Sequence, residues 1–288
     1  MNYLFSKLLN FVTDFAVVDA YEFNDFIKDF YVDNNIPYDM NYLKREERYD
    51  FRKFFPQGKS IVVCIFQYWN SDYEKEYENI ISKIKNPFDF LIRKYPKLNK
   101  EILKIRSTLI ARYALFNDYH KVIRDKLKDV IYELKKNNIN AKIFVDTSPV
   151  FEKILAAYSG LGFIGKNTLL INPLYGSYFF IGGFFLDTKI DQVKKNLEYK
   201  KICDDCRLCE KECPTNALSC GWLNPLKCIS YWTTHNKNKE IPSYILEKSP
   251  YIFGCDICQK VCPYNKDPIS KSLLFKLDFN DLNLNDKV

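Results

Sequence analysis

The chain has 288 residues, of which 47% are hydrophobic and 27% are charged, and its formal net charge is +7. This composition supplies a large core and fits one large domain with a smaller module. Asp14 interrupts the apolar N-terminus, so we predict a core helix there and exclude a signal peptide and a membrane span. We therefore expect a cytoplasmic protein without a membrane partner. The basic charge is consistent with RNA as a partner. It is equally consistent with a general bias toward lysine that has no connection with nucleic-acid binding.

Helices and strands are predicted to alternate along the first part of the chain. Residues 1–55 are expected to be helical, and a β-branched run at residues 59–66 predicts a buried strand. Residues 72–110 have helical tendency, with breaks at Pro87 and Pro96.

An amphipathic helix is predicted from Tyr119, where apolar side chains recur at helical spacing and Asn117 or Asp118 can cap the first turn. Further elements are expected in the order strand 141–146, helix 149–158 and strand 177–187, the last broken by a glycine bulge at Gly182 and Gly183.

The predicted domains follow from this order of elements. Six of the nine glycines lie between Gly160 and Gly183, which indicates tight turns or close approach to a ligand. The alternation favours an α/β or α+β catalytic domain over residues 1–195. A cysteine-rich module over residues 196–270 and a polar, frayed tail over residues 271–288 complete the prediction.

Nine of the ten cysteines lie between Cys203 and Cys262, at spacings typical of metal ligands. The two runs are Cys203-x2-Cys206-x2-Cys209-x3-Cys213-Pro214 and Cys255-x2-Cys258-x3-Cys262-Pro263. Both end in Cys-Pro, as in bacterial ferredoxins, where the last cysteine of a run binds the other cluster. This order favours two 4Fe–4S clusters over zinc and over a secreted disulfide scaffold.

Eight thiolates are needed for two such clusters. Cluster one is assigned to Cys203, Cys206, Cys209 and Cys262, and cluster two to Cys213, Cys255, Cys258 and one more cysteine. Either Cys220 or Cys228 can complete the second set. We choose Cys228, because it opens a distinctive stretch at residues 227–233, and this leaves Cys220 as a spare cysteine.

Several segments upstream of and between the cysteine runs occur together in one family. They are Arg112-Tyr113-Ala114, Asp118-Tyr119-His120, Val145-Asp146-Thr147 with Pro149-Val150, and the stretches 160–167, 176–179, 227–233 and 253–255. With both cysteine runs, this set resembles the epoxyqueuosine reductases, which are cobalamin-dependent iron–sulfur enzymes of tRNA modification. The resemblance covers roughly residues 40 to 268.

The resemblance implies that the protein reduces epoxyqueuosine at the tRNA wobble position to queuosine. Electrons would pass from an unidentified low-potential donor through the two clusters to base-off cobalamin, in a protein that we expect to be a monomer. Asp146 matches the family's proton donor, and burial beside the corrin would raise its pKa and keep it protonated. From the residues alone, Asp146 suits a helix N-cap instead.

The resemblance also implies contacts to cobalamin. Lys166, Asn167 and Thr168 match the family's cobalamin-contacting loop, and a phosphate-binding loop is disfavoured because its glycine motifs are missing. Further matches to positions that face the cofactor are Arg48, Ser230, Asp256 and Ile257, although Phe51 replaces the proline that usually follows Arg48.

Two departures qualify the resemblance. The sequence after His120 lacks the glycine of a cobalt-binding histidine motif, so we predict a helix-start residue lining the site and not a metal ligand. The chain ends soon after the second cysteine run, so we expect a short form without a C-terminal helical-repeat region and with a smaller tRNA footprint. Alternatives are another cobalamin iron–sulfur reductase that resembles reductive dehalogenases, or a ferredoxin-type electron-transfer subunit.

Overall fold

The computed structural model describes residues 2–29, 37–84, 86–193, 202–236, 240–271 and 274–276. Its helices are α1 Asn2–Leu9, α2 Ala20–Ile27, α3 Ser71–Lys83, α4 Pro87–Lys94, α5 Tyr119–Lys136, α6 Glu152–Tyr158, α7 Ile202–Asp205, α8 Leu208–Lys211, α9 Ser243–Lys248 and α10 Ile257–Lys260. Its strands are β1 Asp14–Asp19, β2 Ser60–Gln67, β3 Leu109–Ile110, β4 Ala141–Val145, β5 Phe163–Ile164, β6 Leu170–Ile171, β7 Phe179–Leu186, β8 Leu218–Ser219, β9 Trp222–Leu223 and β10 Tyr251–Phe253. Among these residues no helix is long and apolar enough to cross a membrane.

A four-stranded sheet with the order β1-β2-β7-β4 forms the centre of the fold, and every pairing in it is antiparallel. The predicted strand at residues 59–66 is confirmed as β2, which is buried along its whole length. Successive β2 side chains enter two different cores, as the two-residue period of a strand requires. Both faces of the sheet must therefore be covered, and the fold is of the α+β kind.

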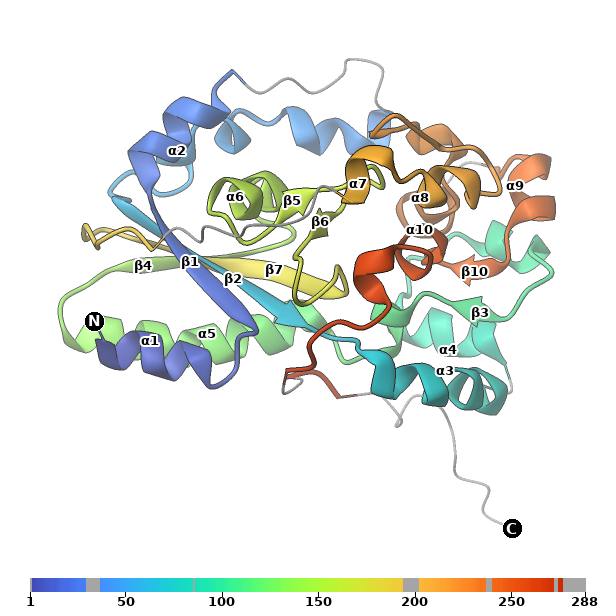
Figure 1. Ribbon diagram of the computed structural model, residues 1–288, viewed down its shortest axis with the longest axis horizontal. Helices are drawn as coiled ribbons and strands as arrows, with labels where there is room; N and C mark the ends of the chain where they lie inside the picture. Colours follow the sequence, from blue (N-terminus) through green and yellow to red (C-terminus); the bar gives the residue numbers. More distant parts are fainter. Residues whose placement is uncertain are drawn as a thin grey trace, which may run out of the picture.

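Helices cover the two faces as separate layers (Figure 1). Helices α1 and α5 lie on one face, and α2 and α6 lie on the other. The predicted amphipathic helix is confirmed as α5, whose apolar stripe is buried against the sheet through Ile123, Leu127, Val130 and Leu134. The side chain of Asp118 accepts a hydrogen bond from the backbone nitrogen of His120 and so caps this helix.

The N-terminal region differs from its prediction as a purely helical segment. Residues Asp14–Asp19 form β1, which pairs with β2 over its whole length. The apolar residues of this segment do not follow the spacing of an amphipathic helix. Its valines pack against the β-branched residues of β2, which is more favourable than exposure to solvent. Tertiary pairing therefore decided the conformation of this segment.

The predicted glycine bulge at Gly182 and Gly183 is wrong. Strand β7 is continuous, and Gly182 and Gly183 pair in regular register with Cys64 and Val63 of β2. A Cβ atom at Gly183 would collide with the Val62 carbonyl oxygen and lie 2.9 Å from the Phe144 ring. The glycine is needed for close packing across the sheet and not for a bend in the strand.

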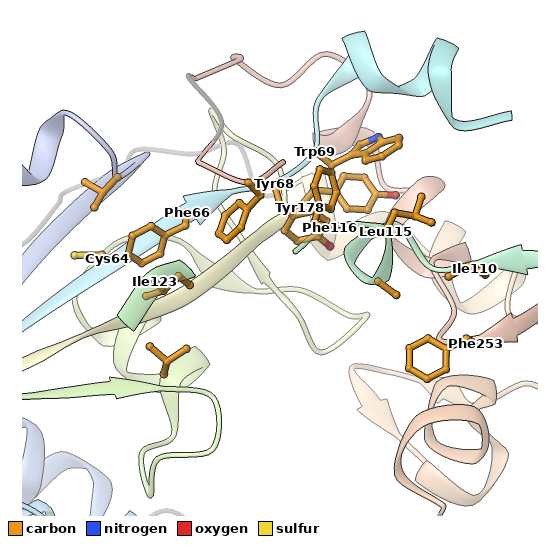
Figure 2. Packing of buried hydrophobic residues seen from close by; sticks show 14 of the residues in the cluster. Cys64, Phe66, Tyr68, Trp69, Ile110, Leu115, Phe116, Ile123, Tyr178 and Phe253 are labelled. Carbon is orange, nitrogen blue, oxygen red and sulfur yellow. The ribbon is translucent and has the colours of Figure 1, made fainter. Parts of the chain in front are cut away.

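The cysteine-rich region packs beside residues 71–116, with which it shares a core (Figure 1). Strand β10 pairs in parallel with β3, although the two strands lie far apart in the sequence. Figure 2 shows the apolar side chains that continue from Cys64 and Phe66 of β2, through Trp69 and Phe116, to Phe253 of β10. The two predicted parts of the chain are therefore joined by a continuous core.

Two predictions of domain limits fall largely outside the described residues. The boundary between residues 195 and 196 lies there, as does most of the tail predicted at residues 271–288. Within the described part, Phe275 is only 2% exposed and its ring contacts the rings of Phe116 and Phe180.

Replacing Gly183 tests the packing of the sheet. We expect Gly183→Ala to lower the free energy of unfolding by about 2–3 kcal/mol, because the new methyl group meets backbone that cannot move without breaking the sheet. Gly182→Ala is the matched control, since its methyl group meets the ends of Val145 and Ile123 at 3.2 and 3.3 Å and the Phe144 carbonyl at 3.2 Å. Urea midpoints of the two anaerobically purified variants provide the measurement, and equal midpoints would contradict this account.

Candidate functional site

The eight predicted cluster cysteines lie around two cavities. Cys203, Cys206, Cys209 and Cys262 line a small one, and Cys213, Cys228, Cys255 and Cys258 line a much larger one. The structure thus brings together the two predicted sets of four, the second of which includes Cys228. Cys220 lies apart from both sets, exposed in the turn between β8 and β9, where it has a positive φ of 50°.

Short helices and loops present these sulfur atoms, and backbone N–H groups point toward them. The nitrogen of Lys166 donates to Cys203 Sγ at 3.3 Å, and that of Ala217 donates to Cys213 Sγ at 3.2 Å. Such N–H···S contacts stabilise thiolates bound to iron and tune the cluster potential. Within the described ranges, no three His, Cys, Asp or Glu side chains are close enough to hold a single metal ion.

The larger cavity has a volume of about 410 Å³ and combines an apolar lining with a few polar groups. Its apolar lining includes Leu169, Leu170, Phe179, Phe180 and Ile229. Five of the predicted site residues other than cysteine also line it, together with Asp146: Asn167, Thr168, Ser230, Asp256 and Ile257. One cavity therefore adjoins both the second cysteine set and the predicted proton donor.

Two predicted cofactor contacts do not line this cavity. Arg48 is buried behind its wall, where the guanidinium donates to the carbonyl oxygens of Tyr42 at 3.0 Å and Val150 at 2.7 Å. Lys166 lies at the smaller cavity instead, and its ammonium group donates to the Cys206 carbonyl oxygen at 3.2 Å. Arg48 fixes the loop that follows Asp146, and Lys166 fixes the first cysteine loop.

Asp146 lies in the loop after β4 in a left-handed backbone conformation, with φ of 43°. Such a conformation is strained for a residue with a side chain, and strain of this kind clusters at functional sites. Asp146 does not cap the helix that follows it, because α6 has Phe151 at its N-cap.

The protonation of Asp146 differs from the expectation. Its Oδ2 atom accepts hydrogen bonds from Tyr119 Oη at 2.9 Å and contacts His120 Nε2 at 2.8 Å. Burial raises the pKa of Asp146, but the hydrogen bonds from His120 and Tyr119 outweigh it and lower that pKa below its ordinary value. Among these neighbours the carboxyl group is ionised at neutral pH, which is opposite to the raised pKa expected beside a corrin.

A buried ion-pair network that the sequence did not reveal holds the second cysteine loop. Arg112 is 1% exposed, and its Nη1 lies 3.1 Å from Asp256 Oδ2 while its Nη2 lies 2.6 Å from Glu74 Oε1. The backbone nitrogen of Arg112 also donates to Asp256 Oδ2 at 2.6 Å. Asp256 lies between Cys255 and Cys258, so Arg112 anchors the loop that presents both thiols.

Aromatic rings enclose this guanidinium. Its central carbon lies 4.5 Å from the ring centre of Tyr77, 5.2 Å from that of Trp69 and 5.6 Å from that of Tyr178. Rings at these distances stabilise a buried cation and exclude water from it. Arg112 stands in one of the family-like segments, but nothing in the sequence paired it with Glu74 and Asp256.

Comparison with known proteins agrees with this arrangement. A family model described as "Epoxyqueuosine reductase QueG, DUF1730" matches residues 48–147. The epoxyqueuosine reductase of Prochlorococcus marinus is 37% identical over 207 residues, which are 70% of this chain and 64% of the relative. That of Cyclobacterium marinum is 35% identical over 225 residues, which are 77% of this chain and 63% of the relative. This chain belongs to the epoxyqueuosine reductase family.

The cysteine-rich region has its own match within this family. A model described as "4Fe-4S double cluster binding domain" covers residues 202–265, so an α/β domain is followed by a ferredoxin-like double-cluster domain. The chain spans less than two thirds of the length of these two curated epoxyqueuosine reductases.

Solved structures of epoxyqueuosine reductases share the fold. The enzyme from Streptococcus thermophilus superimposes with a TM-score of 0.65 at 24% identity, covering 96% of this chain and 70% of that one. An epoxyqueuosine reductase crystallised with an epoxyqueuosine-modified tRNA-Tyr stem loop gives a TM-score of 0.65 at 24% identity, covering 94% of this chain and 65% of that one.

Replacing Arg112 tests its role as the anchor of the second cysteine loop. We expect Arg112→Met to lower the free energy of unfolding by about 3–5 kcal/mol, because it leaves Asp256 buried without a counter-charge. Iron should be lost from cluster two at the same time. Lys104→Met, which removes an exposed pair with Glu101, should leave the urea midpoint and the iron content close to wild type. Equal urea midpoints and equal iron contents in the two variants would contradict the role of Arg112 in holding the second cysteine loop.

Proposed function

We propose that the protein reduces epoxyqueuosine in tRNA to queuosine, with cobalamin bound in the large cavity. The observation that carries this proposal is that one cavity adjoins both the second cysteine set and Asp146. Electrons arriving at a cluster and protons arriving at a carboxylate therefore reach one space. Relatives at 35–37% identity are named epoxyqueuosine reductases, and one solved relative holds the modified tRNA stem loop, which supports this substrate.

The cysteines divide between the clusters according to the cavities that they line. Cluster one takes Cys203, Cys206, Cys209 and Cys262, and cluster two takes Cys213, Cys228, Cys255 and Cys258. Cluster two adjoins the large cavity, so it is the cluster that passes electrons into this cavity. Cluster one receives electrons from a low-potential donor outside the chain.

The cavity suits cobalamin because its lining matches the two kinds of surface that a corrin presents. Aliphatic and aromatic side chains offer an apolar face, while Asn167, Ser177, Ser230 and Gln259 offer amide and hydroxyl groups to the corrin amides. Thr168 and Ile257 line the same space. When bound, cobalamin supplies a strongly reducing cobalt centre. Arg48 holds the loop after Asp146, and Lys166 holds the first cysteine loop.

The residues of the chain supply the protons of the reaction. Conversion of the epoxide to an alkene consumes two electrons and two protons, and the oxygen leaves as water. Asp146 is the group that delivers a proton to the departing oxygen, because its carboxyl group faces the cavity and is held by Tyr119 and His120. Asp146 has a strained, left-handed backbone conformation, and in this conformation its side chain lines the cavity.

An anaerobic assay tests the proposal. The reconstituted protein would be incubated with a strong one-electron reductant and tRNA carrying epoxyqueuosine, with and without added cobalamin. Nucleoside mass spectrometry should find loss of one oxygen only when cobalamin is present. Bound clusters and cobalamin without any conversion would overturn the substrate and point to another reduction, such as a dehalogenation.

Asp146→Asn should lower turnover by about 100-fold or more, since the amide cannot deliver a proton to the leaving oxygen. Iron and cobalamin content should remain at wild-type levels. Asp125→Asn on the surface of α5 is the matched control, and it should leave turnover unchanged. Turnover of Asp146→Asn near that of the control would remove Asp146 from the mechanism.

Cys228→Ser should reduce bound iron from about eight atoms to about four, because it removes a ligand of cluster two. Cys220→Ser should keep the full iron content, since Cys220 is exposed and lies apart from both cysteine sets. Iron analysis after anaerobic purification distinguishes the two. Equal losses from both variants would contradict the choice of Cys228.

A further inference from the structure

A chain of hydrogen bonds runs from the protein surface to Asp146. Asp118 Oδ1 lies 2.9 Å from His120 Nδ1, and His120 Nε2 lies 2.8 Å from Asp146 Oδ2. The side chain of Asp118 is 63% exposed and that of His120 is 31% exposed. One imidazole therefore connects the Asp118 carboxylate with the Asp146 carboxylate, which lines the large cavity and is itself 50% exposed.

The geometry fixes where the protons lie. A carboxylate oxygen only accepts hydrogen bonds, and a neutral imidazole has one N–H group to donate. Both ring nitrogens of His120 contact carboxylate oxygens. A neutral imidazole, with its single N–H group, can donate a hydrogen bond to only one of them. The imidazolium form, with a proton on each nitrogen, satisfies both of them.

The alternative location of the proton is Asp146. As a hydroxyl group, Asp146 Oδ2 could donate to His120 Nε2 and still accept from Tyr119 Oη at 2.9 Å, but the ionised oxygen accepts from both groups in charge-assisted hydrogen bonds, which are stronger. Asp118 Oδ1 is likewise occupied as an acceptor, because it accepts the backbone N–H of His120 at 3.0 Å. The proton that the site holds in reserve therefore belongs on the ring.

Packing holds the imidazole in this position. The ring of Tyr119 stacks on that of His120 with centroids 4.0 Å apart, and on its other side it stacks on Phe180, also at 4.0 Å. The Asp118 cap fixes the start of α5, from which both Tyr119 and His120 project. Rotation of the imidazole would break two hydrogen bonds and one stacking contact.

We propose that His120 holds the reserve proton of the site as an imidazolium and passes it to Asp146, which then delivers it to the substrate. This inference rests on the proposed function for the identity of the substrate and for the role of Asp146 as proton donor. It assigns His120 a proton-relay role and removes the need for Asp146 to be protonated at rest.

Each step of the relay balances. The Nε2–H bond of His120 breaks and an O–H bond forms on Asp146 Oδ2. That O–H bond then breaks as the proton moves to the departing oxygen, and solvent returns one proton to His120 beside the exposed Asp118. No electron is transferred within the relay. Because the reduction consumes two protons, an Asp146 that supplied both of them would have to be reprotonated within each turnover, and the relay provides this.

The surrounding charges favour this state. Burial lowers the pKa of His120, but its hydrogen bonds to the carboxylates of Asp146 and Asp118 outweigh burial and raise that pKa above its ordinary value. Burial and the charge of Asp146 raise the pKa of Glu152 well above its ordinary value, so Glu152 on α6 adds no negative charge. The other titratable groups that face this chain of hydrogen bonds are Tyr42, Arg48, Tyr113, Tyr119 and His235.

Histidine NMR tests the proposal directly, because the chain has only two histidines. In protein with intact clusters and ¹⁵N-labelled histidine, the signal that His120→Gln removes is that of His120. We expect both of its ring nitrogens to carry protons at neutral pH, with a titration midpoint above the ordinary value of about 6.5. Asp118→Asn and Asp146→Asn should each lower that midpoint. A midpoint at or below the ordinary value in the wild-type protein would overturn the proposal.

Turnover measurements provide a second test of the relay. Glutamine keeps a hydrogen-bonding side chain at position 120 but cannot ionise, so His120→Gln should lower turnover by about 100-fold while iron and cobalamin content are retained. Asp118→Asn should lower turnover about tenfold at neutral pH and move the optimum to lower pH. Full activity of His120→Gln would show that the residue only positions Asp146, and would overturn the relay.

Stability provides a readout that needs no substrate. A histidine with a raised pKa in the folded state stabilises the fold below its unfolded pKa of about 6.5, and this contribution is lost as pH rises through the folded value. His120→Gln should therefore lower the urea midpoint more at about pH 6 than at about pH 9. The same loss at both pH values would contradict a charged His120. A raised NMR midpoint in a protein that converts no epoxyqueuosine would uphold the charged relay and reject only the proposed substrate.

Discussion

The buried guanidinium of Arg112 joins the parts of the chain that must meet to form the site. It binds Glu74 from α3 and Asp256 from the loop that presents Cys255 and Cys258. A charge removed from water is tolerated only when partners surround it, so this contact fixes the relative positions of these segments. The parallel pairing of β3 with β10 and the shared apolar core extend the same junction. The position of the second cluster relative to the large cavity follows from it.

The large cavity lies where this junction meets the sheet. Strand β7 and the loop after β4 bring Phe179, Phe180 and Asp146 to it, and the cysteine-rich domain brings its second set of thiols. Electrons and protons thus reach one space from different parts of the chain. A reaction that removes oxygen from carbon needs both, which is the physical basis of the proposed reduction.

The chemistry at Asp146 depends on its neighbours more than on its own burial. A lone carboxyl group beside an apolar cofactor would keep its proton, but His120 and Tyr119 both direct donors at Asp146. The proton is therefore stored on the imidazole of His120, which lies between the carboxylates of Asp118 and Asp146. In the proposed reaction, this arrangement would deliver protons to the cavity while cofactor and substrate occupy it.

Local sequence determined the parts of this protein that depend on short-range spacing. The intervals between the cysteines of each run predicted seven of the eight cluster ligands, and the grouping around the two cavities agrees with them, because neighbouring ligands of a cubane come from one short loop. The spacing left the eighth ligand open between Cys220 and Cys228. Helix α5 was predicted for the same reason, since its apolar period is a local property.

Tertiary structure decided everything that depends on contacts between distant segments. Strand β1 formed because β2 lies beside it, and Gly183 serves close packing because Val62 and Phe144 approach it from two other strands. Arg112 and Asp256 lie 144 residues apart, so no local pattern could pair them. His120 and Asp146 come together across 26 residues, and only that meeting places the proton on the imidazole. Ionisation is set by the charges and donors that fold into contact, which a linear sequence does not specify.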